Sequence, residues 1–202
     1  GGAVLHGCTH RVIGDRIVCA TYLCAAAAAG GEVRLTGVDY RAVSTVALSL
    51  AESGCEVRSE ADAVSLRSTG ALRSVRPVRT APYPGFPTDA QPVLMAALLR
   101  SEGCTVFVEN IFENRYRHVD ELSRMGAEIR VAGRVAVVNG VRTLHGAAVK
   151  CTDLRGGAAL VIAGLSAEGT TRVTELTHID RGYDAIERDL AALGAQIRRE
   201  TT

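Results

Sequence analysis

Apolar and polar positions follow a pattern that the chain repeats three times, and the middle copy shows it most clearly. The polar pair Thr88-Asp89 precedes an apolar run at 92–99, which predicts a helix whose first free N–H groups Asp89 caps. β-Branched and aromatic residues predict a strand at 105–108. Apolar residues three apart predict a second helix over 118–125, and period-2 alternation predicts a strand over 127–131.

The end of this unit is predicted to be a hairpin, because Asn139-Gly140 lies between two apolar runs. Short approach strands are expected before the first helix of the second and third copies, at 75–79 and 147–151. Each copy therefore has the order βαβαββ. The third copy is expected to reach a strand at Ala195–Arg199 and to lack its last strands, which leaves an open sheet edge. We expect another chain segment, or a second molecule by self-association, to pair there.

Residues of the same kind recur at corresponding positions of the three copies, and we call them landmark residues. Glycines at element ends and acids before helices recur at intervals of about 70 residues, which marks repeats of one supersecondary unit. These landmarks are Gly31, Gly103 and Gly169, then Gly54, Gly126 and Gly194, then Asp15, Asp89 and Asp153. The chain, a single domain over 1–202, divides into repeats at 8–72, 73–144 and 145–200. Their alanine-rich helices are expected to form a shared core.

The composition is that of an ordinary soluble globular protein, with 47% hydrophobic residues, 22% charged residues and a net charge of +1. This balance gives no reason to expect a nucleic-acid or membrane partner. The apolar run from Val18 to Ala29 is too short to span a bilayer. The six cysteines are scattered and form no C-x-x-C pair. We therefore expect reduced core cysteines in a cytoplasmic protein, with no metal site and no cofactor.

The copies differ most in the loops beside their helix N-termini, where we expect the functional site. A proline-framed approach at 82–91 delivers Asp89 rigidly to its helix. The acids and arginines expected at this rim are Asp89, Glu113, Asp153, Asp180, Arg115, Arg155 and Arg181. Helix N-termini and arginines bind anions, and a nearby carboxylate can act as a general base. Simpler interpretations stay open: the acids as helix caps, the arginines as structural ion pairs, and His118 and His178 as structural residues.

Six segments resemble the UDP-N-acetylglucosamine enolpyruvyl transferases (1-carboxyvinyltransferases), which act in peptidoglycan synthesis. In family order they are 87–91 (PTDAQ), 112–115 (FENR), 121–127 (ELSRMGA), 152–155 (TDLR), 168–171 (EGTT) and 178–183 (HIDRGY). The resemblance implies an enzyme of two domains with its active site in the cleft between them. For this chain it implies an α/β fold of three βαβαββ units about a pseudo-threefold axis. Such a domain is an inside-out α/β barrel, with helices inside and sheets outside.

The resemblance also implies a reaction, the transfer of enolpyruvyl from phosphoenolpyruvate to the 3-hydroxyl of UDP-N-acetylglucosamine with release of phosphate. Asp89 is implied to contact that hydroxyl as its base, and the backbone carbonyl of Ile111 to contact the sugar nucleotide. Arg155 and Arg181 are implied to hold the phosphate and carboxylate of phosphoenolpyruvate. The implied catalytic residues are Asp89, Arg115, Asp153 and Arg181.

The chain departs from the family in what it lacks. The family's reactive-cysteine loop, a Pro-Gly-Gly-Cys segment, and its N-terminal lysine-asparagine pair are absent. The resemblance therefore covers only the C-terminal part of the enzyme, and we expect the missing N-terminal, catalytic-loop domain to be this domain's partner. The isolated chain is expected to be inactive, because half of the cleft is missing. Two alternatives stay open: an enzyme acting on shikimate 3-phosphate, and a ligand-binding module without chemistry.

Overall fold

Three helices that are buried on almost every side lie at the centre of the molecule. In the computed structural model, which describes residues 2–200, they are α1 (Arg16–Ala29), α3 (Gln91–Ala97) and α5 (Leu154–Leu165), and each contacts the other two. All seven residues of α3 are buried. The many alanines of α1 and the glycines and alanines of α5 let the helix axes approach closely, so the predicted helical core is confirmed.

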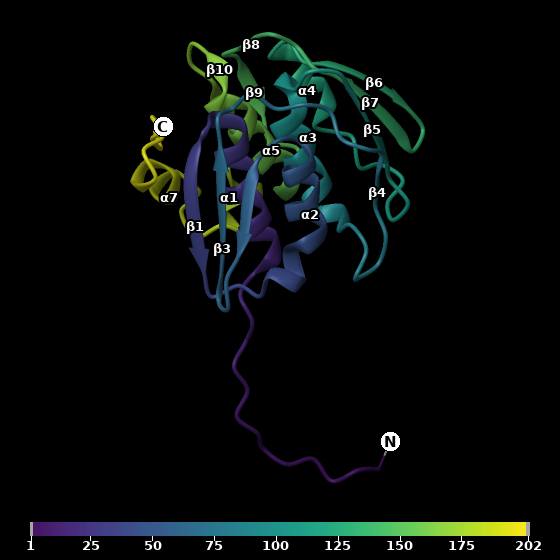
Figure 1. Ribbon diagram of the computed structural model, residues 1–202, viewed down its shortest axis with the longest axis vertical. Helices are drawn as coiled ribbons and strands as arrows, with labels where there is room; N and C mark the ends of the chain where they lie inside the picture. The colour runs from purple at the N-terminus through teal and green to yellow at the C-terminus, as the bar shows by residue number, and fades with distance from the viewer. Residues whose placement is uncertain (1, 201–202) are drawn as a thin grey trace.

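Two sheets flank this helical centre. In the three antiparallel strands of each sheet, the second strand of the hairpin lies in the middle, between the first strand of the hairpin and an earlier strand. The first sheet is β1-β3-β2 and the second is β4-β5-β7-β6, in which β4 joins β5 in parallel and all other pairings are antiparallel. Their bounds are β1 (Gly31–Thr36), β2 (Glu56–Ser59), β3 (Ala63–Ser68), β4 (Val78–Arg79), β5 (Cys104–Val108), β6 (Glu128–Ala132) and β7 (Val135–Asn139). Figure 1 shows β1 and β3 on one side of the molecule and β5, β6 and β7 on the other.

Four short strands make two further pairs, both parallel. β8 (Leu144–His145) pairs with β10 (Ala167–Glu168), and β9 (Ala148–Lys150) pairs with β11 (Arg172–Thr174). The predicted approach strands are confirmed as β4 and β9, although each is shorter than expected. Helices thus alternate with strands along the chain, as the α/β prediction requires.

The remaining helices are short or lie outside the central three. They are α2 (Tyr40–Glu52), α4 (Val119–Arg124), α6 (Thr177–Asp180), α7 (Ile186–Ala192) and the 3₁₀ turns η1 (Thr88–Ala90) and η2 (Leu98–Arg100). α2 is amphipathic and packs against α1, with Val43, Val46 and Leu50 buried. Residues 2–14 form no helix or strand and extend away from the body (Figure 1). Within residues 2–200, no helix combines the length and the apolar character needed to cross a membrane.

The landmark residues of the repeat have matching conformations. All six landmark glycines adopt a positive φ, from 88° at Gly169 to 127° at Gly31, which residues with a Cβ disfavour. The carboxylates of Asp15 and Asp153 cap α1 and α5, and each accepts hydrogen bonds from two backbone N–H groups of the first turn. The cap predictions are therefore confirmed at these two positions.

The hairpin of the second sheet turns at Gly133-Arg134, so the prediction of a turn at Asn139-Gly140 is wrong. Ala132 pairs with Val135, which leaves two residues for the turn. Asn139 ends β7, and a Cβ on Gly140 would overlap the carbonyl oxygen of Ser101. The glycine at 140 is needed for this close approach of two backbone segments rather than for a turn.

The strand predicted at Ala195–Arg199 is not formed, and residues 195–200 carry no helix or strand. A strand needs a neighbour to take up its backbone hydrogen bonds, and within residues 2–200 no strand pairs with this segment. Arg199 instead donates to the carboxylates of Asp180 and Glu187, which ties the segment to α6 and α7. The open strand edge that would support self-association is therefore not formed by these residues.

Four of the six cysteines are core residues, as predicted: Cys19, Cys24, Cys55 and Cys151. Burial raises the pKa of the Cys151 thiol to about 11, so this group is a neutral packing residue near neutral pH. Cys8 and Cys104 are exposed, and the core prediction is wrong for these two.

We predict that Gly140→Ala lowers the free energy of unfolding by roughly 1–3 kcal/mol, because the added methyl group forces two backbone segments apart. Gly7→Ala is the matched control, since a Cβ at position 7 meets nothing within 4 Å. It should change stability by less than about 0.5 kcal/mol. Urea denaturation of both variants measures the difference, and equal stabilities would contradict the close approach of Gly140 to Ser101.

Candidate functional site

A carboxylate held between two arginines lies where the N-terminal ends of α3 and α5 meet. Asp89 Oδ1 accepts a hydrogen bond from Arg115 Nη2 at 2.8 Å, and Asp89 Oδ2 accepts one from Arg155 Nε at 3.3 Å. The two arginine side chains are only 15% and 13% exposed, whereas the Asp89 side chain is 39% exposed. The carboxylate is therefore open to a ligand, and two fixed positive charges lie beside it.

Asp89 does not cap the helix that follows it, so the cap prediction is wrong at this position. The 3₁₀ turn η1 begins at Thr88, directly after Pro87, and no side chain caps it. Asp89 is the middle residue of this turn, inside the helical run rather than before it. Its carboxylate is consequently free to bind the two arginines, unlike the carboxylates of Asp15 and Asp153.

Further hydrogen bonds hold each arginine in place. Arg115, in the loop after β5, also donates to the backbone carbonyl of Thr88 at 3.2 Å. Arg155, in the first turn of α5, donates to the hydroxyl of Tyr183 at 3.3 Å. That hydroxyl lies 2.8 Å from Thr21 Oγ1 in α1. All three central helices therefore contribute to the position of the Asp89 carboxylate.

Asp153 contributes by fixing the backbone that carries Arg155. Its Oδ1 accepts hydrogen bonds from the backbone N–H groups of Arg155 at 3.0 Å and Gly156 at 2.9 Å. The structure thus shows Asp153 as a helix cap next to the site. Its predicted catalytic role stays a prediction.

A buried carboxylate, which the sequence pattern does not reveal, lies behind the Thr88–Asp89 turn and the Ile111–Phe112 loop. Glu109 follows β5 and is only 1% exposed. Its Oε1 accepts from Thr80 Oγ1 at 2.9 Å, from Ile111 N at 2.7 Å and from Phe112 N at 3.0 Å. Its Oε2 accepts from Thr88 Oγ1 at 2.9 Å. The only sequence signal is an acid directly after an apolar strand, which is also typical of an exposed residue.

Three of the predicted rim residues take no part in these hydrogen bonds. Glu113 is exposed and pairs with Arg134 at 3.5 Å. Asp180 accepts from Arg199, and this contact lowers the pKa of the Asp180 carboxyl. The exposed side chain of Arg181 makes no hydrogen bond or ion pair with any residue in the range 2–200. The structure therefore brings together Asp89, Arg115 and Arg155 only.

An uncharged histidine packs behind the arginines. His118 is fully buried, and neither of its ring nitrogens finds a hydrogen-bond partner in the described part of the chain. Burial lowers the pKa of His118 to about 4, against the opposing effect of the Asp153 charge. A ring that is neutral at pH 7 packs as a largely apolar group, so the structural interpretation of His118 is favoured.

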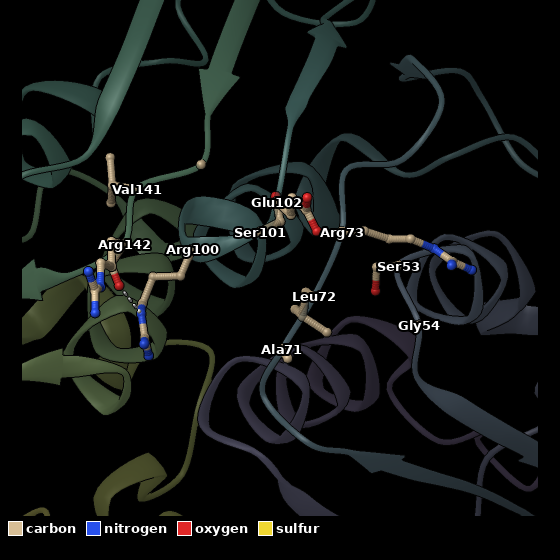
Figure 2. Close-up of a pocket in the computed structure, with 11 residues that line it drawn as sticks. Ser53, Gly54, Ala71, Leu72, Arg73, Arg100, Ser101, Glu102, Val141 and Arg142 are labelled. Carbon is tan, nitrogen blue, oxygen red and sulfur yellow. Dashed lines mark hydrogen bonds between the residues drawn. The ribbon is translucent and has the colours of Figure 1, made fainter.

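A cavity of about 500 Å³ lies away from this cluster, at the opposite end of α3. Figure 2 shows Arg100 and Arg142 together on one side of it, whereas Arg73 points away on the other. Arg100 donates to the backbone carbonyls of Arg142 and Ser166, and Arg73 donates to that of Glu52. These arginines thus bind the chain's own carbonyls. In the range 2–200, no group of three or more His, Cys, Asp or Glu side chains is placed to hold a metal ion.

The sequence matches one protein family over nearly its whole length. The profile of EPSP synthase (3-phosphoshikimate 1-carboxyvinyltransferase) matches residues 1–190. UDP-N-acetylglucosamine 1-carboxyvinyltransferase from Gluconacetobacter diazotrophicus is 52% identical over 199 residues, which are 98% of this chain and 47% of that protein. The protein of the same name from Desulfofundulus thermocisternus is 52% identical over 96% of this chain and 80% of its own length. The chain spans about half the length of the first of these relatives.

Solved structures give the same picture of the fold. The enolpyruvyl transferase NikO from Streptomyces tendae superposes with a TM-score of 0.82 at 31% identity, over 93% of this chain and 44% of that chain. EPSP synthase from Acinetobacter baumannii superposes with a TM-score of 0.73 over 95% of this chain and 45% of that chain. Its identity is 22%, so it supports the fold alone.

We predict that Asp89→Asn lowers the free energy of unfolding by roughly 1–3 kcal/mol, because it leaves two mostly buried arginines without their shared negative charge. The estimate is below that for a fully buried pair, since the Asp89 side chain is 39% exposed. Glu56→Gln is the control: it removes a carboxylate 3.9 Å from Arg58, where both side chains are exposed. Chemical denaturation should show at most about 0.5 kcal/mol for this control. Equal losses would contradict a special role for the Asp89 cluster.

The buried His118 gives a second prediction, for the pH dependence of stability. Its pKa is about 4 in the folded chain against 6.5 ordinarily, so only the unfolded chain takes up its proton between these values. The stabilisation of the folded chain that results from this pKa difference is fully present above pH 6.5. It is lost, by about 1.4 kcal/mol per pH unit, as the pH falls toward 4. Denaturation of wild type and His118→Phe at pH 7 and pH 5 isolates this slope. Identical pH dependence would show that His118 is not buried as a neutral ring.

Proposed function

Because this chain belongs to the EPSP synthase family and, by its relatives, to the UDP-N-acetylglucosamine 1-carboxyvinyltransferases, we propose that it forms one wall of their active site. The proposed reaction transfers enolpyruvyl from phosphoenolpyruvate to the 3-hydroxyl of UDP-N-acetylglucosamine, a cytoplasmic step of peptidoglycan synthesis. The observation that carries the proposal is the Asp89 carboxylate between Arg115 and Arg155. A base beside two fixed cations suits a neutral hydroxyl that attacks an anionic partner.

In the proposed mechanism Asp89 takes the proton of the sugar 3-hydroxyl while that oxygen bonds to C2 of phosphoenolpyruvate. C3 takes up a proton from solvent or from the opposite wall of the cleft. C3 then returns a proton to solvent or to the opposite wall, which restores the double bond as the C2–O bond to phosphate breaks. Asp89 gives its proton to the departing phosphate or to solvent, and an enolpyruvyl ether remains. Arg115 and Arg155 stabilise the negative charges of the phosphate and carboxylate, for which bidentate guanidinium groups are suited.

The remaining predicted site residues have supporting roles in this proposal. Arg181, whose side chain is exposed and makes no ion pair within residues 2–200, would hold phosphoenolpyruvate together with Arg155. The backbone carbonyl of Ile111 would contact the sugar nucleotide, and the Ile111 side chain is 38% exposed. Asp153 would act by holding the first turn of α5, from which Arg155 extends.

We further propose that the fold consists of three βαβαββ units about a pseudo-threefold axis, in an inside-out α/β barrel. The units would be 8–72, 73–144 and 145–200 of one domain. The common order of β1-β3-β2 and β5-β7-β6 supports this, as do the parallel pairs β4–β5 and β9–β11 that precede and follow a central helix.

The partner of this chain would be the rest of the enzyme, with the reactive-cysteine loop on the opposite wall. The chain spans 47% of the relative from Gluconacetobacter diazotrophicus, which leaves room for such a domain there. Positioning and electrostatic stabilisation need groups on both walls, so the chain alone should release phosphate far more slowly than the two walls together.

Titration of the ¹⁵N-labelled chain with UDP-N-acetylglucosamine tests the proposal by NMR. We predict shifts of the Asp89, Ile111 and Phe112 amides. Asp89→Asn should weaken binding by about tenfold, the factor expected for one charge-assisted hydrogen bond. Glu56→Gln should leave the affinity unchanged.

The same titration with shikimate 3-phosphate separates the alternatives. Chemical-shift changes with shikimate 3-phosphate only would indicate that it, and not UDP-N-acetylglucosamine, is the substrate. Phosphate release by the chain alone at the rate of a complete relative would contradict the one-wall proposal. UDP-sugar binding without turnover, even when the missing half is supplied, would indicate a binding module.

A further inference from the structure

The buried carboxylate of Glu109 lies directly behind the two loops that the proposed site uses, although the proposed chemistry gives it no role. We propose that Glu109 is a positioning residue. It fixes the Ile111–Phe112 loop relative to the Thr88–Asp89 turn, so that the carbonyl of Ile111 and the carboxylate of Asp89 face one sugar nucleotide. The identity of the ligand in this inference rests on the proposed function, whereas the contacts of Glu109 are independent of it.

Glu109 carries a carboxylate that is buried. Glu109 is 1% exposed, and it forms no ion pair with any residue in the described range. An isolated buried carboxylate is strongly disfavoured unless hydrogen-bond donors replace its water. Glu109 has four donors within 3.0 Å, two hydroxyls and two backbone N–H groups. The carboxylate therefore organises these donors around itself.

Three of these four donors lie in the two segments of the proposed site. The two backbone donors belong to Ile111 and Phe112, in the loop after β5. The Thr88 hydroxyl belongs to the turn that carries Asp89, and the Thr88 carbonyl accepts from Arg115. One side chain thus joins the two segments that would contact the sugar.

Glu109 uses both of its carboxylate oxygens as acceptors. Oε1 already accepts three hydrogen bonds, and Oε2 accepts the one from Thr88. A glutamine has the same size but only one acceptor oxygen, and its NH₂ group can only donate. The Thr88 hydroxyl can turn to accept from that NH₂ group, so Glu109→Gln keeps the shape of the link but removes its charge, whereas Glu109→Ala removes all four hydrogen bonds. Thr80 also binds the N–H of Asn110 at 2.8 Å, so the strand end stays attached.

Amide hydrogen exchange, followed by NMR on the whole 202-residue chain, tests the proposal. In Glu109→Ala, the Ile111 and Phe112 amides should exchange at least about tenfold faster, because hydrogen bonds to a charged group are worth that factor or more, and Glu109→Gln should give a smaller increase because its acceptor oxygen is neutral. Affinity for UDP-N-acetylglucosamine should fall by a similar factor. Glu121→Gln is the matched control, since Glu121 accepts from the backbone N–H of Lys150 at 2.9 Å, away from the site. It should speed exchange at Lys150 only.

The outcomes separate this inference from the proposed function. Unchanged exchange at Ile111 and Phe112 in Glu109→Ala would overturn it, and so would faster exchange with unchanged UDP-sugar affinity. If wild type does not bind UDP-N-acetylglucosamine, the proposed function fails, and the exchange rates alone decide whether Glu109 holds the loop. If Glu109→Ala does not fold, Glu109→Gln and Thr88→Val, which removes one donor, decide the outcome.

Discussion

Close packing of α1, α3 and α5 organises the folded body of this chain. Their small side chains allow three helices to share one interface, and the sheets flank that centre. The same packing brings the start of α3 next to the start of α5. Asp89 and Arg155, which are far apart in sequence, therefore meet across a helix interface, and Thr21 of α1 supports them through Tyr183. The site is a consequence of the core rather than an addition to it.

Around this core, buried charges are stabilised by hydrogen bonds that form one continuous chain. From the back of the site to α1, its members are Glu109, Thr88, Arg115, Asp89, Arg155, Tyr183 and Thr21. Side chains in such a network lose little further freedom when a ligand binds, which suits the role of base proposed for Asp89. Asp89, at its centre, is partly exposed and so remains accessible from solvent.

The sequence pattern predicts the helical core, most strands and two of three caps, because hydrophobic period and capping are local properties. It fails where distant backbone segments meet. Asn139-Gly140 has the composition of a hairpin, but contact with Ser101 decides its conformation. Asp89 is of a residue type that is typical of helix caps, but a 3₁₀ turn places it inside the helix. Glu109 is missed because burial of a lone acid depends on the donors that tertiary structure brings to it.

The central claim is that the Asp89 carboxylate and the Ile111 carbonyl face one sugar nucleotide. A crystal structure of the chain with UDP-N-acetylglucosamine tests this most directly. The account predicts the sugar 3-hydroxyl within about 3 Å of an Asp89 carboxylate oxygen, the distance of a hydrogen bond. It also predicts a ligand donor at the carbonyl oxygen of Ile111. A ligand bound elsewhere, for example in the cavity beside Arg100 and Arg142, with Asp89 still closed between its two arginines, would contradict it.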